Sequence, residues 1–205
     1  MKRLFFLAIF SALFLQNSIM ARAETIYLTD AQLELHNGKA LLKCKDGADR
    51  VTVRRALHGM VEIIVNGSRT TLSEAEAFGM EIRGGGGNDE IIVEDSINFG
   101  LVLKGNDGND VIKGGRGNDK IEGGDGSDLL YGGGGNDNID GGSGNDRIEG
   151  GPGFDSLRGS WGSDTIVDNN RIVREREVRR VSPVVVYPRP HYRYHYRSGV
   201  IVRVR

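Results

Sequence analysis

The sequence predicts an all-β protein whose central part is a parallel β-solenoid. Three observations carry this prediction. A nine-residue unit recurs seven times in an unbroken row, glycine takes the same places in almost every unit, and an aliphatic residue comes two places after an aspartate that every unit contains. Such short units can bury an apolar core only by stacking on their neighbours, which is how solenoids are built.

The repeated unit has the pattern Gly-Gly-x-Gly-x-Asp-x-aliphatic-x. An eighth copy occupies residues 84–92, and a twelve-residue unit, 93–104, separates it from the unbroken row. The units of the row start at Gly105, Gly114, Gly123, Gly132, Gly141, Gly150 and Gly159. The aliphatic residues of the eight copies are Ile91, Ile112, Ile121, Leu130, Ile139, Ile148, Leu157 and Ile166.

This pattern resembles the hemolysin-type calcium-binding repeat, the RTX nonapeptide, over residues 84–167. The resemblance implies a parallel β-roll, a bacterial source and the binding of several Ca²⁺ ions. In that family, proteases and lipases carry such repeats after a separate catalytic domain, which we do not find in this sequence. Members exported in one step typically carry an uncleaved C-terminal secretion signal and no N-terminal one. This chain departs from that pattern, because it begins like a signal peptide and its C-terminal segment is strongly basic.

The positions of the unit have physical roles. Six residues are expected to form a turn and three a short strand, in which the aliphatic residue points inward. The glycines supply positive φ angles and leave backbone carbonyls uncovered, and asparagine in the fifth place tolerates left-handed conformations. If each turn reverses the chain, two units complete one coil and residues 18 apart stack. Asp89 then joins such a stack if residues 93–104 occupy half a coil.

The stacked aspartates favour calcium as the ion. Parallel strands lie about 4.8 Å apart, so an ion midway between two turns has ligands at about 2.4 Å, within the range for Ca²⁺ and beyond that for Mg²⁺. Hard oxygen ligands also suit calcium better than zinc. Stacked carboxylates repel one another by roughly 0.9 kcal/mol per pair even in water, and a cation reverses this term.

We therefore expect one column of aspartates to comprise Asp110, Asp128, Asp146 and Asp164, with Asp89 added, and a second column to comprise Asp119, Asp137 and Asp155. The expected metal ligands are these eight carboxylates, with backbone carbonyls around Gly84, Gly85, Gly87, Gly105, Gly108, Gly114, Gly115, Gly117, Gly123, Gly124, Gly126, Gly132, Gly133, Gly135, Gly141, Gly142, Gly144, Gly150, Gly151 and Gly153. The alternative, a disordered glycine-rich linker, needs no aliphatic residue in every unit, but it describes the calcium-free chain well.

Residues 1–23 read as a signal peptide. Two basic residues precede an apolar run from Leu4 to Leu15, and Ala21-Arg22-Ala23 fits a cleavage site. A membrane-anchored start is the alternative, although the run is short for a span. No later stretch is expected to cross a membrane. The protein is therefore expected in the periplasm, at the cell surface or outside the cell.

Residues 24–83 are expected to form a β-rich N-terminal cap on the repeats, which extend over 84–168. "CKDGADRVT" keeps Gly47 and Asp49 at the fourth and sixth places of the unit and reads as a degenerate coil. "MVEIIVNGSRTTL" predicts a hairpin, and "SEAEAFG" predicts one helical turn. Cys44 is the only cysteine, so it forms no internal disulfide and reads as a small apolar residue near the core.

Residues 169–205 form a basic tail rich in arginine and tyrosine. It carries ten arginines against two glutamates, net +8, whereas residues 24–168 carry 14 basic against 26 acidic residues, net −12. The tail could bind an anionic envelope polymer, and no nucleic acid is expected as a partner in the cell because the protein is exported. A solvated or disordered tail is the alternative.

"PVVVY" and "VIVRVR" could pair as strands. Trp161 either caps the last coil or is an exposed turn residue.

The sequence predicts no enzyme. His36 and His58 are isolated, and neither stands in a metal-ligand spacing. The first prediction is a non-catalytic, exported calcium-binding β-roll that folds when calcium binds. The alternatives are an adhesin that attaches through its basic tail, and an accessory module of an extracellular hydrolase.

Overall fold

The computed structural model describes residues 24–28, 30–168, 171–176, 184–185, 193–197 and 200–204, so the predicted signal peptide lies outside the described residues. The strands form two nine-stranded sheets and one small sheet. In spatial order the first sheet contains β1 (Glu24–Tyr27), β2 (Ala31–His36), β3 (Lys39–Cys44), β7 (Glu81–Gly86), β9 (Val102–Asp107), β11 (Lys120–Asp125), β13 (Asn138–Ser143), β15 (Ser156–Trp161) and β18 (Val184–Val185).

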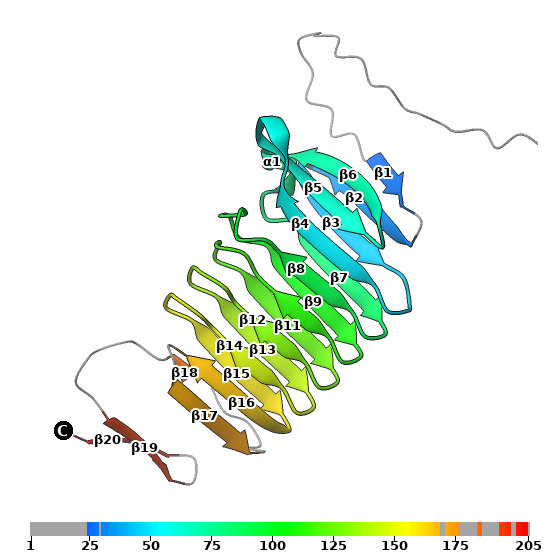
Figure 1. Cartoon of the computed structure of the whole chain (residues 1–205). Helices are drawn as coiled ribbons and strands as arrows, with labels where there is room; N and C mark the ends of the chain where they lie inside the picture. Colours follow the sequence, from blue (N-terminus) through cyan, green and yellow to red (C-terminus); the bar gives the residue numbers. More distant parts are fainter. Residues whose placement is uncertain are drawn as a thin grey trace, which may run out of the picture.

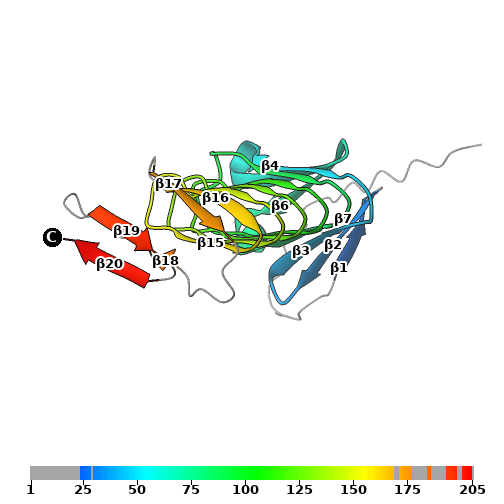
Figure 2. The ribbon, with the colours of Figure 1, turned by 90° about the horizontal axis from the view of Figure 1, so that it is seen from below.

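The second sheet faces the first (Figure 2). Its order is β17 (Arg171–Arg176), β16 (Ser163–Asp168), β14 (Arg147–Glu149), β12 (Leu129–Tyr131), β10 (Val111–Lys113), β8 (Glu90–Val93), β4 (Arg50–Arg55), β5 (Met60–Val65) and β6 (Ser68–Ser73). The third sheet pairs β19 (Arg193–Arg197) with β20 (Val200–Val204). Two short helices complete the described elements: the 3₁₀ turn η1 (Leu57–Gly59) and α1 (Glu74–Ala77).

The repeats form a parallel β-solenoid, as predicted (Figure 1). The chain alternates between the two sheets, and each strand pairs in parallel with the strand one coil away. Ile121 lies opposite Ile139 in the first sheet, and Ile112 lies opposite Leu130 in the second, so residues 18 apart stack. Two nonapeptides therefore complete one coil.

The twelve-residue unit occupies half a coil, which is the condition under which Asp89 was expected to join the first column. Strand β9 at its end pairs in parallel with β7 and β11, and Leu103 lies between Ile82 and Ile121. In the second sheet Ile91 consequently lies opposite Ile112, 21 residues further along the chain. The three additional residues are accommodated in the irregular segment 94–101 between the sheets.

The two kinds of strand differ in length, which the repeat pattern did not predict. The three-residue strands β10, β12 and β14 match the expectation. In the first sheet β9, β11, β13 and β15 are six residues long, because the second and third residues of each following turn also pair with the next coil. Gly124 lies opposite Gly142, for example, and Asp125 lies opposite Ser143.

The core between the sheets is thin. The aliphatic residue of each unit points inward, and those from Ile91 to Ile148 are completely buried. Leu157 and Ile166, in the last coil, remain 4% and 5% exposed. One apolar side chain per strand provides little hydrophobic stabilisation, so the stability of the roll depends strongly on the interactions in its turns.

The N-terminal region extends the solenoid by one coil. Strand β3 pairs in parallel with β7, and β4 pairs in parallel with β8, so "CKDGADRVT" turns from one sheet to the other as a degenerate coil. The predicted hairpin is formed by β5 and β6, with Asn66 and Gly67 at positive φ in its turn. The predicted helical turn is α1, whose N-cap Ser73 forms a capping box with Glu76.

The C-terminal edge of the solenoid is covered by antiparallel strands. Strand β17 pairs with β16 along six residues, and β18 pairs with β15. Trp161 is 57% exposed, so the exposed-residue alternative describes it and the capping alternative does not. The predicted pairing of "PVVVY" with "VIVRVR" is wrong, because Val184 and Val185 pair with β15 and the final strand β20 pairs with β19.

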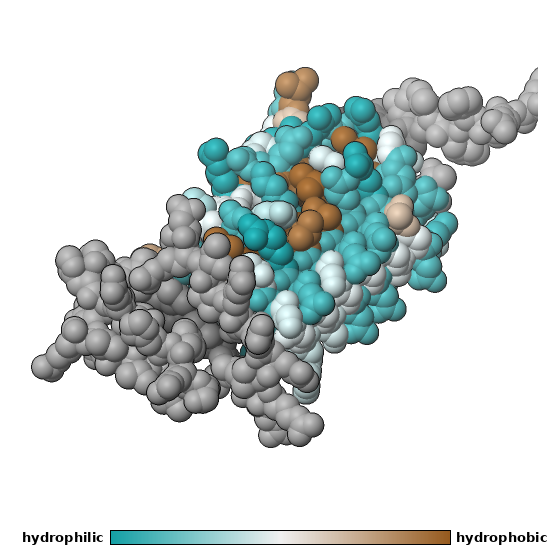
Figure 3. Space-filling model, turned by 60° about the horizontal axis from the view of Figure 1, so that its bottom comes forward, coloured by the Kyte–Doolittle hydropathy of each residue, from teal (hydrophilic) through white to brown (hydrophobic). Residues whose placement is uncertain are grey.

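Ion pairs connect strands of both sheets, as between Lys104 and Glu122 at 3.0 Å in the first sheet and between Arg54 and Glu62 at 2.7 Å in the second. The second sheet also presents apolar residues, such as Val111 opposite Leu129, and Leu129 is 39% exposed. Figure 3 shows a mostly hydrophilic surface with hydrophobic side chains gathered in its middle. Neither helix in the described part of the chain has the length and apolar character of a membrane span.

Candidate calcium sites in the turns

The repeat aspartates form two columns along the roll, one in the turns at each side. Each is 3% exposed or less. Within a column, the backbone amide of one aspartate donates a hydrogen bond to Oδ1 of the aspartate one coil further, as from Asp110 to Asp128 and from Asp128 to Asp146. The same bond joins Asp89 to Asp110, Asp146 to Asp164, Asp119 to Asp137 and Asp137 to Asp155. These contacts make each carboxylate part of the backbone ladder.

The second carboxylate oxygen of most of these aspartates has no hydrogen-bond partner. In the described residues this holds for Oδ2 of Asp89, Asp110, Asp128, Asp137, Asp146, Asp155 and Asp164, all of which are buried. A buried charged oxygen without a donor is strongly unfavourable. The same arrangement recurs coil after coil, which fits cations bound along the column and not an isolated packing defect.

The first glycine of each unit has no side chain, and this leaves space beside Oδ2 of the aspartate in the same unit. A Cβ added to Gly105 would overlap Oδ2 of Asp110 in its own turn and would lie 2.6 Å from the carbonyl oxygen of Gly123 in the next coil. A Cβ on Gly123 would meet Asp128 and Gly141 in the same way. Glycine is therefore needed here for space, and a carboxylate oxygen and a backbone carbonyl oxygen lie next to each other at each of these glycines.

The glycine at the fourth place of the unit has a different role. Gly126 has a φ of 139°, and a Cβ on it would overlap the carbonyl oxygen of Gly108 in the preceding coil. The carbonyls of the fourth places therefore point along the column into the next turn. These close approaches keep backbone oxygens at the turns uncovered, as the sequence suggested.

The asparagines of the fifth place form a second ladder. The amide of Ser127 donates to Oδ1 of Asn109 at 2.7 Å, and the amide of Asn136 donates to Oδ1 of Asn118 at 2.7 Å. None of the asparagines of this place has a positive φ, so the prediction that they serve left-handed conformations is wrong. They are present because their short amide side chains reach the backbone of the next coil.

Burial raises the pKa of the column carboxyls. It brings the pKa of Asp137 and Asp146 to about 7, with a contribution from carboxylates one coil away, and that of Asp89 and Asp128 to about 6. The pKa also lies above its ordinary value in Asp110, Asp119, Asp155 and Asp164, mainly through burial. Backbone hydrogen bonds favour the charged form but do not offset the burial. Ionising the columns is therefore unfavourable, and a bound cation would offset this cost.

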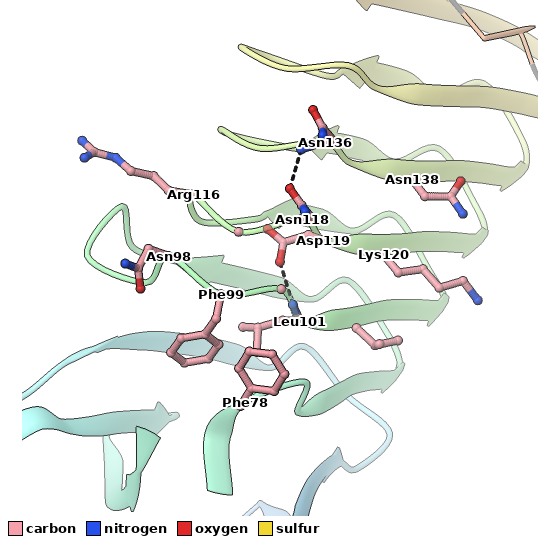
Figure 4. A pocket seen from close by; sticks show the side chains of 13 residues that line it. Phe78, Asn98, Phe99, Leu101, Arg116, Asn118, Asp119, Lys120, Asn136 and Asn138 are labelled. Carbon is pink, nitrogen blue, oxygen red and sulfur yellow. Dashed lines mark hydrogen bonds between the residues drawn. The ribbon is translucent and has the colours of Figure 1, made fainter. Parts of the chain in front are cut away.

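Asp119 departs from this arrangement. Its Oδ1 accepts the amide of Leu101 (Figure 4). Its Oδ2 accepts the amide of Gly115 at 3.1 Å. Both oxygens are thus hydrogen-bonded within the protein. The residue at the corresponding position of the preceding coil is Leu101, because the twelve-residue unit has no aspartate at that position. The second column therefore begins with a carboxylate that the protein already satisfies.

A depression of about 660 Å³ lies beside Asp119, where the twelve-residue segment breaks the regular stacking (Figure 4). The rings of Phe78 and Phe99 form one end of it, with their centroids 5.9 Å apart. The side chains of Asn118 and Asn136 also line the depression. Each of these asparagines uses its Oδ1 in the fifth-place ladder.

One residue of the columns was missed as a candidate ligand. Asp49, in the degenerate coil, is 6% exposed, and its amide donates to Oδ1 of Asp89 at 2.8 Å. Its Oδ2 has no partner among the described residues. The spacing of Gly47 and Asp49 identified the coil, but glycine is absent from the first place of this turn, and that absence obscured the site.

The donor set fits calcium. Carboxylate and carbonyl oxygens are the ligands that Ca²⁺ takes, six to eight at a time. No group of three or more His, Cys, Asp or Glu side chains that could hold a metal occurs within the part of the chain that the structure describes. Any ion in the turns would accordingly be held by few side chains and by many backbone oxygens, with the aspartates of the columns supplying the charge.

Comparison with known proteins agrees with this chemistry. A family model, the RTX calcium-binding nonapeptide repeat, matches residues 81–96, 104–139 and 140–167, in four copies. No curated protein matches the chain. Residues 81–167 are therefore an array of RTX calcium-binding nonapeptide repeats, folded as a parallel β-roll.

Proposed function

We propose that the protein is an exported, non-catalytic scaffold that folds when Ca²⁺ ions bind between the coils of its roll. The observation that carries this proposal is the repeated buried Oδ2 without a hydrogen-bond donor, seen in every repeat aspartate from Asp89 to Asp164 except Asp119. When bound, calcium would neutralise the stacked carboxylates. The chain's own part is to hold these carboxylates in register through their Oδ1 atoms and to leave carbonyl oxygens uncovered at the turn glycines.

The thin core supports coupling between ion binding and folding. A roll with one inward aliphatic residue per strand gains little from burial, and its ionised columns oppose folding at neutral pH. The free energy of binding several ions would then become free energy of folding. Export fits this reading, because extracellular calcium-binding modules work at about 10⁻⁴–10⁻³ M calcium.

Circular dichroism and calorimetry test this proposal. Adding calcium to the metal-free protein should convert a coil spectrum to a β spectrum, and an equal concentration of magnesium should do so much less. Calorimetry should show several ions bound per chain, with dissociation constants of about 10⁻⁴–10⁻³ M. A complete β spectrum that chelators leave unchanged would refute calcium-dependent folding.

The charge of residues 169–205 supports a second role, in which the tail binds an anionic envelope polymer. This segment contains ten arginines and only two glutamates, whereas the rest of the mature chain is acidic. Arginine-rich segments bind polyanions by releasing counterions, and this requires no specific partner sequence. Association with a hydrolase is an alternative role, which co-purification of the two proteins would favour.

A further inference from the structure

We infer that the turn formed by residues 44–49 binds an additional calcium ion together with the turn 84–89, and that this site joins the N-terminal strands to the roll. The inference rests on the proposed calcium binding and extends it to a turn outside the residues that the family model matches. It would place six aspartates, from Asp49 to Asp164, in the first column.

The turn 44–49 makes the contacts of a repeat turn although its sequence has diverged. The amide of Gly47 donates to the carbonyl of Gly86, as the amide of Gly108 donates to the carbonyl of Asp125. The amide of Glu90 donates to the carbonyl of Asp49 at 2.8 Å, as Leu129 donates to Asp110 at 2.8 Å. The turn is therefore in register with the column.

Backbone oxygens are also directed as in the repeat turns. A Cβ on Gly87 would lie 2.5 Å from the carbonyl oxygen of Gly47, and a Cβ on Gly85 would lie 2.8 Å from that of Lys45. The carbonyls of the second and fourth places thus approach the turn 84–89. Oxygens from both the backbone and the side chain are available here.

Asn66 supplies the hydrogen-bond donor that a preceding coil would otherwise supply to Asp49. In the interior of the column, Oδ1 of each aspartate accepts the amide of the preceding aspartate. Asp49 has no preceding aspartate, and its Oδ1 accepts Nδ2 of Asn66 at 2.5 Å. Asn66 is itself held by the backbone of Arg50, whose amide donates to Oδ1 of Asn66 at 2.9 Å. The ladder ends with a side-chain donor.

The remaining oxygen of Asp49 is in the same state as those of the repeat. Oδ2 is buried without a donor, and so is Oδ2 of Asp89 one coil away. No hydrogen bond inside the described residues satisfies either atom, and a cation shared between the two turns would satisfy both. Asn66 belongs to the hairpin of β5 and β6, so this ion would stabilise the hairpin and the roll together.

The variant Asp49→Asn tests this site, with Asp46→Asn as its control. Asp46 lies in the same turn, is exposed, and loses the same charge when substituted. Calorimetry on the full protein should show one calcium ion fewer in Asp49→Asn and an unchanged number in Asp46→Asn. Equal numbers and affinities in the wild type and Asp49→Asn would overturn the site. A wild type that binds no calcium would instead refute the proposed function.

Hydrogen exchange on the unmodified protein gives an independent test, which does not require the variant to fold. The amides of residues 45–51 should gain protection over the same calcium range as those of residues 105–110. Lack of protection at 45–51, at a calcium concentration that protects the repeat turns, would overturn the inference.

Discussion

Oδ2 of Asp119 accepts a hydrogen bond from the amide of Gly115 in its own turn, whereas Oδ2 of Asp137, one coil further, has no partner among the described residues. The difference originates in the twelve-residue segment. Gly115 packs against this segment, since a Cβ on it would lie 2.8 Å from the carbonyl oxygen of Ile97, and its φ is not positive, whereas Gly133 at the same place of the next coil has a φ of 101°. Two aspartates at the same place of the repeat therefore have different needs for a cation.

We expect Asp137→Asn to lower the number or affinity of bound calcium ions more than Asp119→Asn. Asp137 lies inside its column with a free oxygen, and Asp119 already receives two donors. Calorimetry should compare both variants with Asp125→Asn, which removes an exposed carboxylate and should change little. Equal losses in the variants at residues 119 and 137 would contradict the distinction.

Position within the first column should also matter. Asp128 has a neighbouring aspartate on either side, at Asp110 and Asp146, whereas Asp164 lies in the last coil and has a neighbour only at Asp146. Asp128→Ala should therefore reduce calcium stoichiometry and thermal stability more than Asp164→Ala. Equal effects in a calcium titration would indicate that ions are not shared between adjacent coils.

The metal-free protein should lose stability as the pH rises. The pKa of Asp137 and Asp146 is raised to about 7 in the folded state, and that of an unfolded aspartate is about 3.9. The folded state binds these protons more tightly, so its stability is greatest below about pH 4 with respect to these groups and falls as the pH rises to about 7.

Circular dichroism of the protein in calcium-free buffer checks this dependence. The β content should be higher at pH 5 than at pH 8. Saturating calcium should reverse the order, because calcium binds the ionised carboxylates and displaces their protons. A metal-free β content that rises between pH 5 and pH 8 would show that the column carboxyls are not the controlling groups.

Two glycines of neighbouring turns should respond oppositely to alanine. Gly126 has a φ of 139° and no room for a Cβ, whereas the Cβ of an alanine at Gly134 would lie 3.8 Å from its nearest neighbour, in ordinary contact. In calcium, Gly126→Ala should destabilise the roll by about 1–3 kcal/mol or more. Gly134→Ala should be neutral or should stabilise it by about 0.4–1 kcal/mol. Thermal unfolding of the two variants measures this contrast.

A peptide of residues 169–205 should bind heparin with strong salt dependence, because its net charge is +8. The full protein should bind better with calcium than without, since calcium weakens any attraction between the tail and the acidic roll. The peptide should bind equally in both conditions. Absence of binding at low salt would remove the support for a tail that binds polyanions.

Much of the roll follows from residue spacing alone. The interval of nine residues, with one aliphatic residue and one aspartate per unit, predicted the coil of 18 residues and both columns. It also predicted that Asp89 joins Asp110 if the longer unit fills half a coil. These features depend on short-range periodicity, and a periodic chain that must bury its aliphatic residues has few ways to stack.

Other features depend on contacts between segments that lie far apart in the sequence. Asn66 completes the column at Asp49 because a hairpin folds back beside the first coil. The satisfied carboxylate of Asp119 results from packing against an irregular segment. The repeat pattern determined which residues stack and which atoms face the turns. Only the tertiary structure decided where each column begins, because the donors at those ends come from outside the repeat.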